Sequence, residues 1–332
     1  MSAISWNCRG LGNPLTVNAL QKVVLEKDPT LVFLMDTKLD ITEIDNIKRK
    51  VERQQGPVVP SINQAGGLAL LWKNSMQVDI QTCSPQYIDA IVTEKQGMKK
   101  WRFTSFYGHP ETGKREESWK LMENLSHRSN LPWVCMGDFN EIMHAKEKEG
   151  GGVRPGGQMQ AFRGAINKCQ LRDLGYVGSD YTWSRRLGSR GWVRERLDRA
   201  LVSINWDETF LAARLFHVAT SVSNHCILVL KETTYPRKQK QRPKVWRFES
   251  MFLEDASCKE VVQGAWDMGK SRESSWPLET CIEECQVSLK AWNKQTFGLV
   301  GKQVAELQRR IQALESMKGD TTILETIHAT KK

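Results

Sequence analysis

The predicted fold depends first on the stretch Trp133-Val134-Cys135-Met136-Gly137-Asp138-Phe139-Asn140. In this stretch an apolar run is followed directly by a short polar turn. The run at residues 133–136 is typical of a strand buried on both faces of a sheet. Asp138 and Asn140 follow at the end of that strand, where open α/β sheets carry their ligand sites. A lone Gly-Asp-x-Asn stretch is also ordinary turn chemistry, so the prediction of a site needs further examples.

Further polar side chains stand at the ends of apolar, strand-like runs elsewhere in the chain. They are Asn7 after a short strand, Asp36 after residues 31–35, Asp198 in Arg196-Leu197-Asp198, and Ser223-Asn224-His225 before residues 226–230. Each example alone indicates little. As a set, they predict that side chains far apart in the sequence converge on one site.

Up to about residue 230 the chain has the pattern of short strands separated by turns, with a few helices between them. Asn13 and Pro14 predict the start of one helix, with a side-chain cap followed by proline at the first helical position. We expect further strands at residues 67–72, 78–82, 88–93, 101–107 and 226–230, and a hairpin built from residues 181–184 and 192–203. This mixture predicts a layered α/β domain.

A basic stretch then separates this domain from a helical tail. Residues 237–247 hold six basic residues, no acidic residue and one proline, which predicts an exposed linker. Beyond it, two sets of apolar residues at helical spacing predict an antiparallel helical hairpin. The sets are Ile282, Cys285, Leu289 and Trp292, and then Val300, Val304, Leu307, Ile311 and Leu314. We therefore expect a domain at residues 1–231, a linker at 232–250 and a helical extension at 251–332, which is a structural arm or, alternatively, a partner-binding module.

The overall composition narrows the function classes. Of the 332 residues, 40% are hydrophobic and 26% are charged, as in ordinary globular proteins. The apolar runs are too short to span a membrane, no secretory signal is visible, and the eight cysteines form no CxxC pair. These features predict an intracellular protein, nuclear or cytoplasmic, that is not secreted. With 48 Lys and Arg against 38 Asp and Glu, the net charge is +10, which favours polyanionic partners such as nucleic acid or anionic lipid.

The converging polar residues suit phosphodiester hydrolysis. Mg²⁺ prefers hard oxygen ligands, so one or two carboxylates together with amide oxygens form a suitable cradle. A metal held there polarises a phosphoryl oxygen and stabilises the leaving alkoxide. A histidine near the metal, such as His225, takes a proton from the attacking water or stabilises the charge on phosphorus. A carboxylate such as Asp198 on its other ring nitrogen fixes the tautomer.

The motifs occur in a characteristic order, which is Trp6-Asn7-Cys8-Arg9-Gly10-Leu11-Gly12, Phe33-Leu34-Met35-Asp36-Thr37-Lys38-Leu39, Tyr107-Gly108-His109-Pro110, Gly137-Asp138-Phe139-Asn140, Arg196-Leu197-Asp198 and Ser223-Asn224-His225. This order resembles the endonuclease/exonuclease/phosphatase superfamily and, more narrowly, the endonuclease domain of plant LINE-type non-LTR retrotransposons. The motifs span residues 1 to about 231. The tail looks like the segment that leads to a reverse transcriptase; no polymerase motif follows, so the chain resembles a truncated element.

This resemblance implies a DNase I-like, four-layer α/β sandwich, in which two mixed sheets pack face to face between outer helices and the site lies at one rim. It also implies Mg²⁺ (or Mn²⁺) as cofactor, no small-molecule cofactor, and double-stranded DNA that is nicked to prime reverse transcription. By the same resemblance, Asn7 and Asp36 bind the metal and Asn224 lies close to it. Tyr107 contacts the scissile phosphate, and Asp138 aligns the attacking water. Asn140 supports the transition state, and Asp198 orients His225.

Two departures from the motifs of the family predict reduced cleavage on a retained fold. Asp36 stands where the family has glutamate, so the carboxylate is drawn back by about 1.5 Å. Asn224 stands where the family has aspartate, so one negative charge beside the metal is lost. A catalytically degenerate nucleic-acid binder is therefore an alternative to an active endonuclease, and a lipid phosphatase of the same superfamily is a third possibility.

DNA contact is expected at the predicted hairpin. Arg185, Arg186 and Arg190 stand at its tip, where arginine side chains contact backbone phosphates and sense the width of a groove. A solvated charged loop explains the same residues equally well. The sequence makes no prediction of the oligomeric state.

Overall fold

The computed structural model describes residues 1–94, 99–188, 191–232, 252–253, 255–271, 277–296, 306–307 and 309–310. By their contacts, these residues form two compact units. The first contains the described residues up to 232 with all described strands, and the second contains two helices. The predicted linker at residues 232–250 lies almost entirely outside the described residues.

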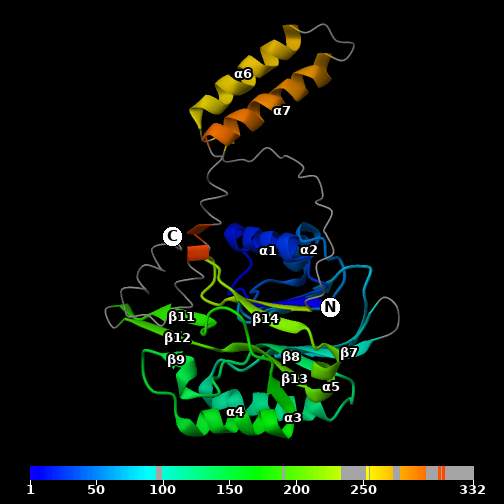
Figure 1. Cartoon of the computed structure of the whole chain (residues 1–332), viewed down its shortest axis with the longest axis vertical. Coiled ribbons are helices and arrows are strands. Elements are labelled where there is room, and N and C mark those ends of the chain that lie inside the picture. Colours follow the sequence, from blue (N-terminus) through cyan, green and yellow to red (C-terminus); the bar gives the residue numbers. More distant parts are fainter. Residues whose placement is uncertain are drawn as a thin grey trace. The chain divides into compact units, whose positions relative to one another are not determined.

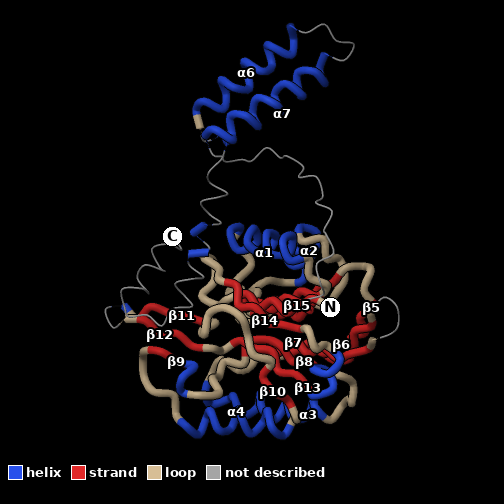
Figure 2. The backbone as a smooth tube through the Cα atoms, viewed as in Figure 1, coloured by secondary structure: helices blue, strands red, loops and turns tan. Residues whose placement is uncertain are grey.

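Two mixed six-stranded sheets form the centre of the first unit (Figure 2). The first sheet has the order β14 (Ala213–Val218), β15 (Ile227–Glu232), β1 (Ser2–Asn7), β2 (Leu31–Met35), β4 (Leu68–Trp72) and β3 (Val58–Val59). The second sheet has the order β10 (Leu171–Asp173), β13 (Asp198–Ser203), β8 (Trp133–Asp138), β7 (Lys100–Tyr107), β6 (Tyr87–Thr93) and β5 (Gln77–Ser84). Each sheet contains one parallel pair, β1 with β2 and β7 with β8, and its other neighbouring strands are antiparallel.

Helices cover the outer face of each sheet, as Figure 1 shows for the first unit. α1 (Pro14–Lys27) and α2 (Ile41–Lys50) pack on the first sheet. α3 (Arg115–Ser126) and α4 (Gly156–Lys168) pack on the second, and the short α5 (Ile204–Thr209) follows β13. The predicted four-layer α/β sandwich with a helical extension is confirmed.

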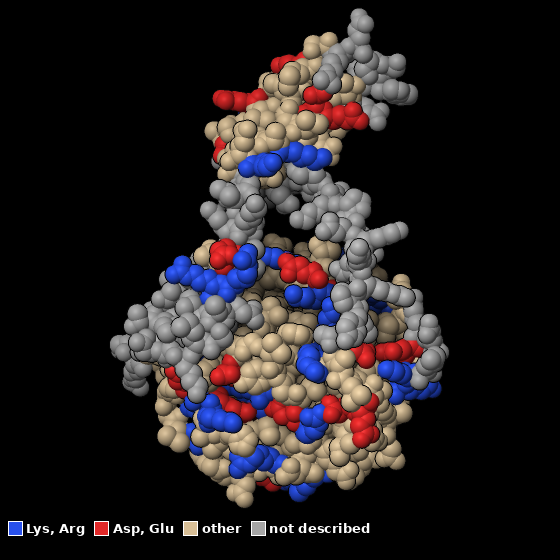
Figure 3. Space-filling model, viewed as in Figure 1, with Lys and Arg blue, Asp and Glu red and all other residues tan. Residues whose placement is uncertain are grey.

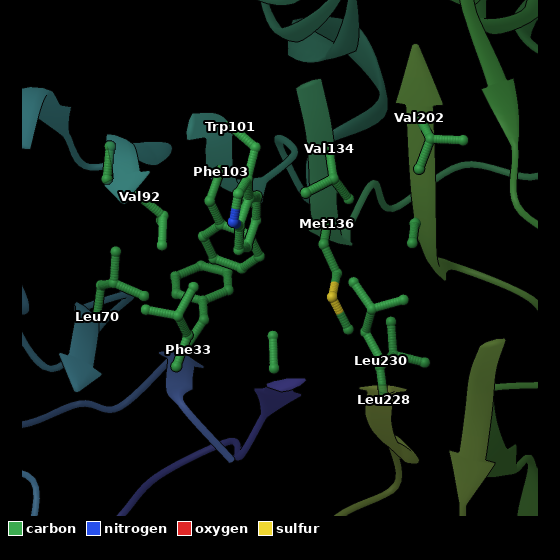
Figure 4. Packing of buried hydrophobic residues seen from close by; sticks show 14 of the residues in the cluster. Phe33, Leu70, Val92, Trp101, Phe103, Val134, Met136, Val202, Leu228 and Leu230 are labelled. Carbon is green, nitrogen blue, oxygen red and sulfur yellow. The ribbon is translucent and has the colours of Figure 1, made fainter. Parts of the chain in front are cut away.

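The core between the sheets explains why the central strands are apolar at consecutive positions. In β2, Phe33 belongs to the core between the sheets, whereas Val32 and Leu34 belong to the cluster under α1 and α2. Figure 4 shows side chains of the two sheets, among them Phe33 and Met136, on opposite sides of this core. Because both faces of such a strand are buried, both must be apolar.

The helix starts show which local signals the sequence carries. The Asn13 side chain accepts a hydrogen bond from the Leu15 N–H and Pro14 begins α1, as predicted. α2 was not predicted, although it begins with a capping box in which Asp40 and Glu43 each accept a hydrogen bond from the backbone of the other. Aspartate followed by glutamate three residues later is a signal that sequence reasoning could have used.

The predicted single strand at residues 192–203 is wrong, because two strands with different partners occupy that stretch. β12 (Trp192–Glu195) forms the predicted hairpin with β11 (Trp183–Arg186), and β9 (Lys148–Glu149) completes a small third sheet. The chain then leaves this sheet, and β13 joins the second six-stranded sheet.

A hydroxyl group distant in sequence fixes this break. Thr182 Oγ1 accepts hydrogen bonds from the N–H groups of Leu197 (3.0 Å) and Asp198 (2.9 Å), which therefore take no part in the hairpin ladder. Thr182 lies 15 residues before Leu197. No local pattern around residue 197 could have revealed the break.

The second unit is an antiparallel pair of helices, α6 (Ala256–Ser271) and α7 (Pro277–Thr296). The first predicted apolar set lies in α7, where three of its members are buried and Ile282 is exposed. Among the described residues, its partner is α6. Most of the second predicted set, at residues 300–314, lies outside the described residues. Gly269 of α6 permits the close approach, because a Cβ there would lie 2.5 Å from the Cα of Cys281.

Charge is interspersed on the visible surface. On the face shown in Figure 3, Lys and Arg side chains of the described residues lie among Asp and Glu side chains, so the net positive charge is not concentrated there in one patch. None of the described helices has both the length and the apolar character needed to cross a membrane.

Burial of His217 makes the stability of the first unit depend on pH. The side chain is buried in β14, and its Nδ1 lies 2.7 Å from the carbonyl oxygen of Ser179. Burial lowers the pKa of His217 to about 4, against about 6.5 in an unfolded chain. The unfolded state therefore binds more protons than the folded state between these values, and this contribution to the free energy of unfolding is lost as the pH falls through that range.

We expect a His217→Gln variant to lack this contribution. Between pH 7.5 and pH 5.0, the wild-type protein should lose about 2 kcal/mol more of its free energy of unfolding than the variant does. Urea denaturation at both pH values measures the difference, and comparison with the variant cancels the titration of all other groups. An equal loss in both proteins would contradict the assignment.

Candidate active site

Strand ends from both six-stranded sheets meet at one rim and bring the predicted residues together. β1 of the first sheet ends at Asn7, and β8 of the second ends at Asp138. β13 begins at Asp198, which lies directly opposite Asp138 in the antiparallel register. Tyr107 is the parallel neighbour of Asp138 at the end of β7. The fold thus gathers residues that are far apart in the sequence.

Asp138 lies at the centre of this group and is fully buried. Its Oδ2 accepts a hydrogen bond from Asn7 Nδ2 at 2.9 Å, and its Oδ1 accepts one from the Asn140 backbone N–H at 2.8 Å. Asn140 has a left-handed backbone with φ of +54°, and its side chain donates to the carbonyl oxygen of Gly108 at 2.9 Å. Asn140 is therefore a fixed part of the turn that holds the Asp138 carboxylate.

His225 and Asp198 form a hydrogen-bonded pair next to Asp138. The Nδ1 of His225 lies 2.9 Å from Asp198 Oδ2 and 3.9 Å from Asp138 Oδ2. The hydroxyl of Ser223 ties the pair to β1, because it donates to the Asn7 carbonyl oxygen at 2.9 Å and accepts from the His225 N–H at 3.1 Å. Ser223 thus fixes the His225–Asp198 pair against the end of β1.

Burial and mutual charge shift the titration of these groups. Burial raises the pKa of Asp138, and the negative charge of Asp198 raises it further. Burial alone would lower the pKa of His225, but the charge and the hydrogen bond of Asp198 outweigh burial and raise it above the usual value. Burial also raises the pKa of Tyr107, as do the charges of Asp138 and Asp36, so its hydroxyl keeps its proton and is available as a donor.

The donor atoms of the cluster fit a divalent cation. Asp138, Asp198 and His225 each offer one ligand atom, and these atoms lie within 4.8 Å of one another. Asn7 is 4% exposed, and its Oδ1 is buried without a hydrogen-bond partner. A buried acceptor left unpaired costs about 1–3 kcal/mol. An oxygen of this kind beside a buried carboxylate is available to a hard cation such as Mg²⁺.

Asp36 and Asn224 lie near the cluster but have other partners. Asp36 has φ of +52°, its Oδ1 accepts from the Gly66 N–H at 3.2 Å, and it lines the same pocket as Asn7 and His225. The amide of Asn224 satisfies two donors when its oxygen faces them, at 3.1 Å from Arg9 Nη1 and 2.8 Å from Trp183 Nε1. Both lone pairs of that oxygen are then in use.

The sequence profile of the Endonuclease/Exonuclease/phosphatase family matches residues 4–221. The chain belongs to this family. Membership agrees with metal-dependent phosphodiester hydrolysis as the chemistry of the site. A comparison with the sequences of curated proteins gives no match.

Solved structures share the fold of this family member. The AP endonuclease LMAP from Leishmania major is 18% identical with a TM-score of 0.55, and the match covers 69% of this chain and 86% of that one. The 3′–5′ exonuclease NExo from Neisseria meningitidis is 17% identical with a TM-score of 0.53, and covers 70% and 100%. The 3′ phosphatase NExo from Neisseria bound to product DNA hairpin is 18% identical with a TM-score of 0.52, and covers 70% and 100%. At these identities the likeness concerns the fold alone.

The pocket of this endonuclease/exonuclease/phosphatase family member has a volume of about 450 Å³ and many basic side chains in its wall. Arg185 of β11, one of the predicted DNA-contacting residues, belongs to the wall. Arg186 is exposed on the same strand, and Arg190 lies outside the described residues. Sequence reasoning missed the other basic residues of the wall. The missed basic residues are Arg9, Arg115, Lys148 and Arg154.

Of the missed residues, only Arg9 had a usable signal, because it stands inside a motif that was singled out. Arg115, Lys148 and Arg154 come from segments that carried no functional pattern, and only the folded structure brings them to the pocket. Two buried glutamates pair with these three cations: Arg115 Nη1 lies 2.8 Å from Glu141, Arg154 Nη2 lies 2.7 Å from Glu195, and Lys148 also pairs with Glu195.

The pairing of His225 with Asp198 gives a direct prediction. Because the Asp198 charge raises the pKa of His225, we expect Asp198→Asn to lower that pKa below the wild-type value. NMR titration of the His225 ring protons in metal-free protein measures it. Asp40→Asn, a change of the same kind at the start of α2, serves as the control and should leave the His225 titration unchanged. Identical titration curves for wild type and Asp198→Asn would contradict the pairing.

Proposed function

We propose that this protein is a Mg²⁺-dependent phosphodiesterase that nicks double-stranded DNA and is derived from the endonuclease of a plant LINE-type retroelement. The observation that supports it most strongly is the buried cluster of Asp138, Asp198 and His225 beside the unpaired oxygen of Asn7. Metal-assisted hydrolysis requires hard oxygen ligands for the cation, and a histidine–carboxylate pair beside them can transfer a proton. Residues 1–231 form the nuclease domain in this proposal, followed by the linker and the helical extension.

The metal is held by Asn7 and Asp36 in this proposal, with Asn224 close by. When bound, the metal supplies Lewis-acid stabilisation of the charge on the phosphoryl oxygens. Mn²⁺ is an alternative ion, because it takes similar oxygen ligands. The Asn7 contribution rests on its unpaired buried Oδ1. Asp36 would have to share its carboxylate between the metal and the Gly66 N–H.

The remaining side chains handle the proton and the phosphate. Asp198 occupies Nδ1 of His225, so the other ring nitrogen, Nε2, meets the substrate and either receives a proton from water or donates to a phosphoryl oxygen. Asp138 aligns the attacking water, and Asn140 supports the transition state from the adjoining turn. Tyr107, whose hydroxyl stays protonated, donates a hydrogen bond to the scissile phosphate.

DNA as substrate is supported by charge and position. The exposed Arg185 lines the pocket, and Arg186 follows it on the same hairpin. Arginines at such a position contact backbone phosphates. We propose the same role for Arg190. The net charge of +10 adds long-range attraction for a polyanion. The retroelement origin rests on the order and content of the six sequence motifs.

A second candidate is a nucleic-acid binder that has lost most of its cleavage activity. The observations that favour it are the partners of the two departing residues. Asp36 already accepts from the Gly66 N–H, and the oxygen of Asn224 faces Arg9 and Trp183. The Asp36 carboxylate is then shorter than a glutamate and already has a partner, and the Asn224 amide brings no negative charge to the metal.

Nicking of supercoiled plasmid in Mg²⁺ separates the two candidates. For an active enzyme, we expect a chelator to abolish nicking and His225→Ala to lower its rate by about 10²–10⁴-fold, because the proton transfer is lost. The matched control is His127→Ala at the exposed end of α3, which should stay within twofold of wild type. Nicking that survives in His225→Ala would refute the assignment. A wild-type protein that is inert in Mg²⁺ and Mn²⁺ but binds duplex DNA would be the binder.

The length of the carboxylate at position 36 gives a further prediction. Asp36→Glu restores a reach of about 1.5 Å towards the metal, and we expect the Mg²⁺-dependent nicking rate to rise about tenfold, which corresponds to about 1.4 kcal/mol of barrier. Asp36→Asn, which keeps the length and removes the charge, should lower the rate. The same plasmid assay at several Mg²⁺ concentrations measures both. A glutamate variant no faster than wild type would show that the length of this side chain does not limit cleavage.

A further inference from the structure

Arg9 lines the candidate active-site pocket, and the motifs assign it no role. It follows the metal-binding candidate Asn7 by two residues, and its side chain is exposed. Tyr107 and His225 line the same pocket. The guanidinium is therefore positioned where a substrate phosphate would arrive.

Arg9 differs from most of the other cations in this wall in carrying no ion pair. Arg115, Lys148 and Arg154 are each paired with a buried glutamate. Within the part of the chain that the structure describes, no carboxylate lies within ion-pair distance of Arg9. Its positive charge is thus available to an anionic ligand, whereas the three neighbouring cations already share two buried glutamates.

The surroundings hold Arg9 in one place. Its backbone has φ of +52°, a left-handed conformation that residues other than glycine rarely adopt. The next two N–H groups, of Gly10 and Leu11, donate to the carbonyl oxygens of Asp36 (2.8 Å) and Thr37 (2.9 Å), so the loop after β1 is bound to the loop after β2.

Among the described residues, the side chain of Arg9 has a hydrogen-bond partner at one nitrogen only. The oxygen of Asn224 accepts from Arg9 Nη1 at 3.1 Å and is itself fixed by Trp183 Nε1 at 2.8 Å. A guanidinium has five N–H donors. Most of them remain free, and a guanidinium oriented in advance suits the two-pronged recognition of a phosphate group.

We propose that Arg9 binds a phosphodiester group of nucleic acid in this pocket, and that Asn224 and Trp183 are positioning residues that hold its guanidinium. The inference rests on the proposed function for the identity of the ligand. In this proposal, Asn224 accepts a hydrogen bond from Arg9 as a neutral amide. A charged metal ligand at position 224 would have a different role. Asn224 then acts on substrate through Arg9.

Binding without metal tests this inference separately from cleavage. We would measure the anisotropy of a labelled duplex of about 20 base pairs in a chelator, over a range of salt concentrations. Arg9→Gln should weaken binding about tenfold and lower the slope of log affinity against log salt by about one, because one phosphate contact is lost. Arg9→Lys should keep the slope but recover only part of the affinity, since it lacks the fork of donors. Arg49→Gln on the outer helix α2 is the matched control and should bind within twofold of wild type.

A double-mutant cycle tests the positioning role of Asn224. Asn224→Ala should weaken binding severalfold in the wild-type background and have little effect in Arg9→Gln, since its only route to the DNA is through Arg9. Equal losses in both backgrounds would overturn this role. Arg9→Gln that binds like Arg49→Gln, or a wild-type protein that binds no duplex, would overturn the assignment of Arg9. A protein that shows the predicted binding pattern but does not nick would contradict the proposed function and support this inference.

Discussion

One hydrogen bond, from Asn7 Nδ2 to Asp138 Oδ2, joins the end of β1 in the first sheet to the end of β8 in the second. Both side chains are buried, so the bond forms away from water, where an unpaired partner would be costly. This hydrogen bond also fixes the orientation of the Asn7 side-chain amide. Because Nδ2 points to the carboxylate, Oδ1 is left buried without a partner. The contact that fixes the two sheets at this rim therefore creates the oxygen that a cation can use.

A network of buried charges positions the other half of the site. Arg199 of β13 is fully buried and pairs with Glu147 and Asp173, each at 2.9 Å, and Arg196 contacts the same two carboxylates. Burial opposes ionisation of Asp173, but the two arginines outweigh it and lower the pKa of Asp173 to about 2. The network ties the start of β13 to β10 and to the turn before β9. Asp198 is the first residue of β13, so this network also fixes the carboxylate that orients His225.

The sequence predicts the parts of this protein that depend on local chemistry. Apolar runs in β2 and β8 reveal strands buried on both faces, and the polar residues that end them converge as expected, with Asn7, Asp138, Asp198 and His225 in direct or shared contact. Features that depend on distant partners were not predictable. The break before β13 depends on the Thr182 hydroxyl, and the partners of Asn224 and Arg154 appear only when separate segments meet. α2 is different, because its capping box was present in the sequence and was overlooked.

The proposed function requires the rim where the two sheets meet to bind a divalent cation through the amide oxygen of Asn7. Crystals soaked in Mn²⁺ and measured near the manganese absorption edge test this requirement, because the anomalous signal locates the ion independently of any activity. We expect a strong peak bonded to Asn7 Oδ1 and beside the Asp138 carboxylate, and we expect its loss in an Asn7→Leu variant. Manganese bound elsewhere, with no peak at this rim, would show that the rim is not the cation site.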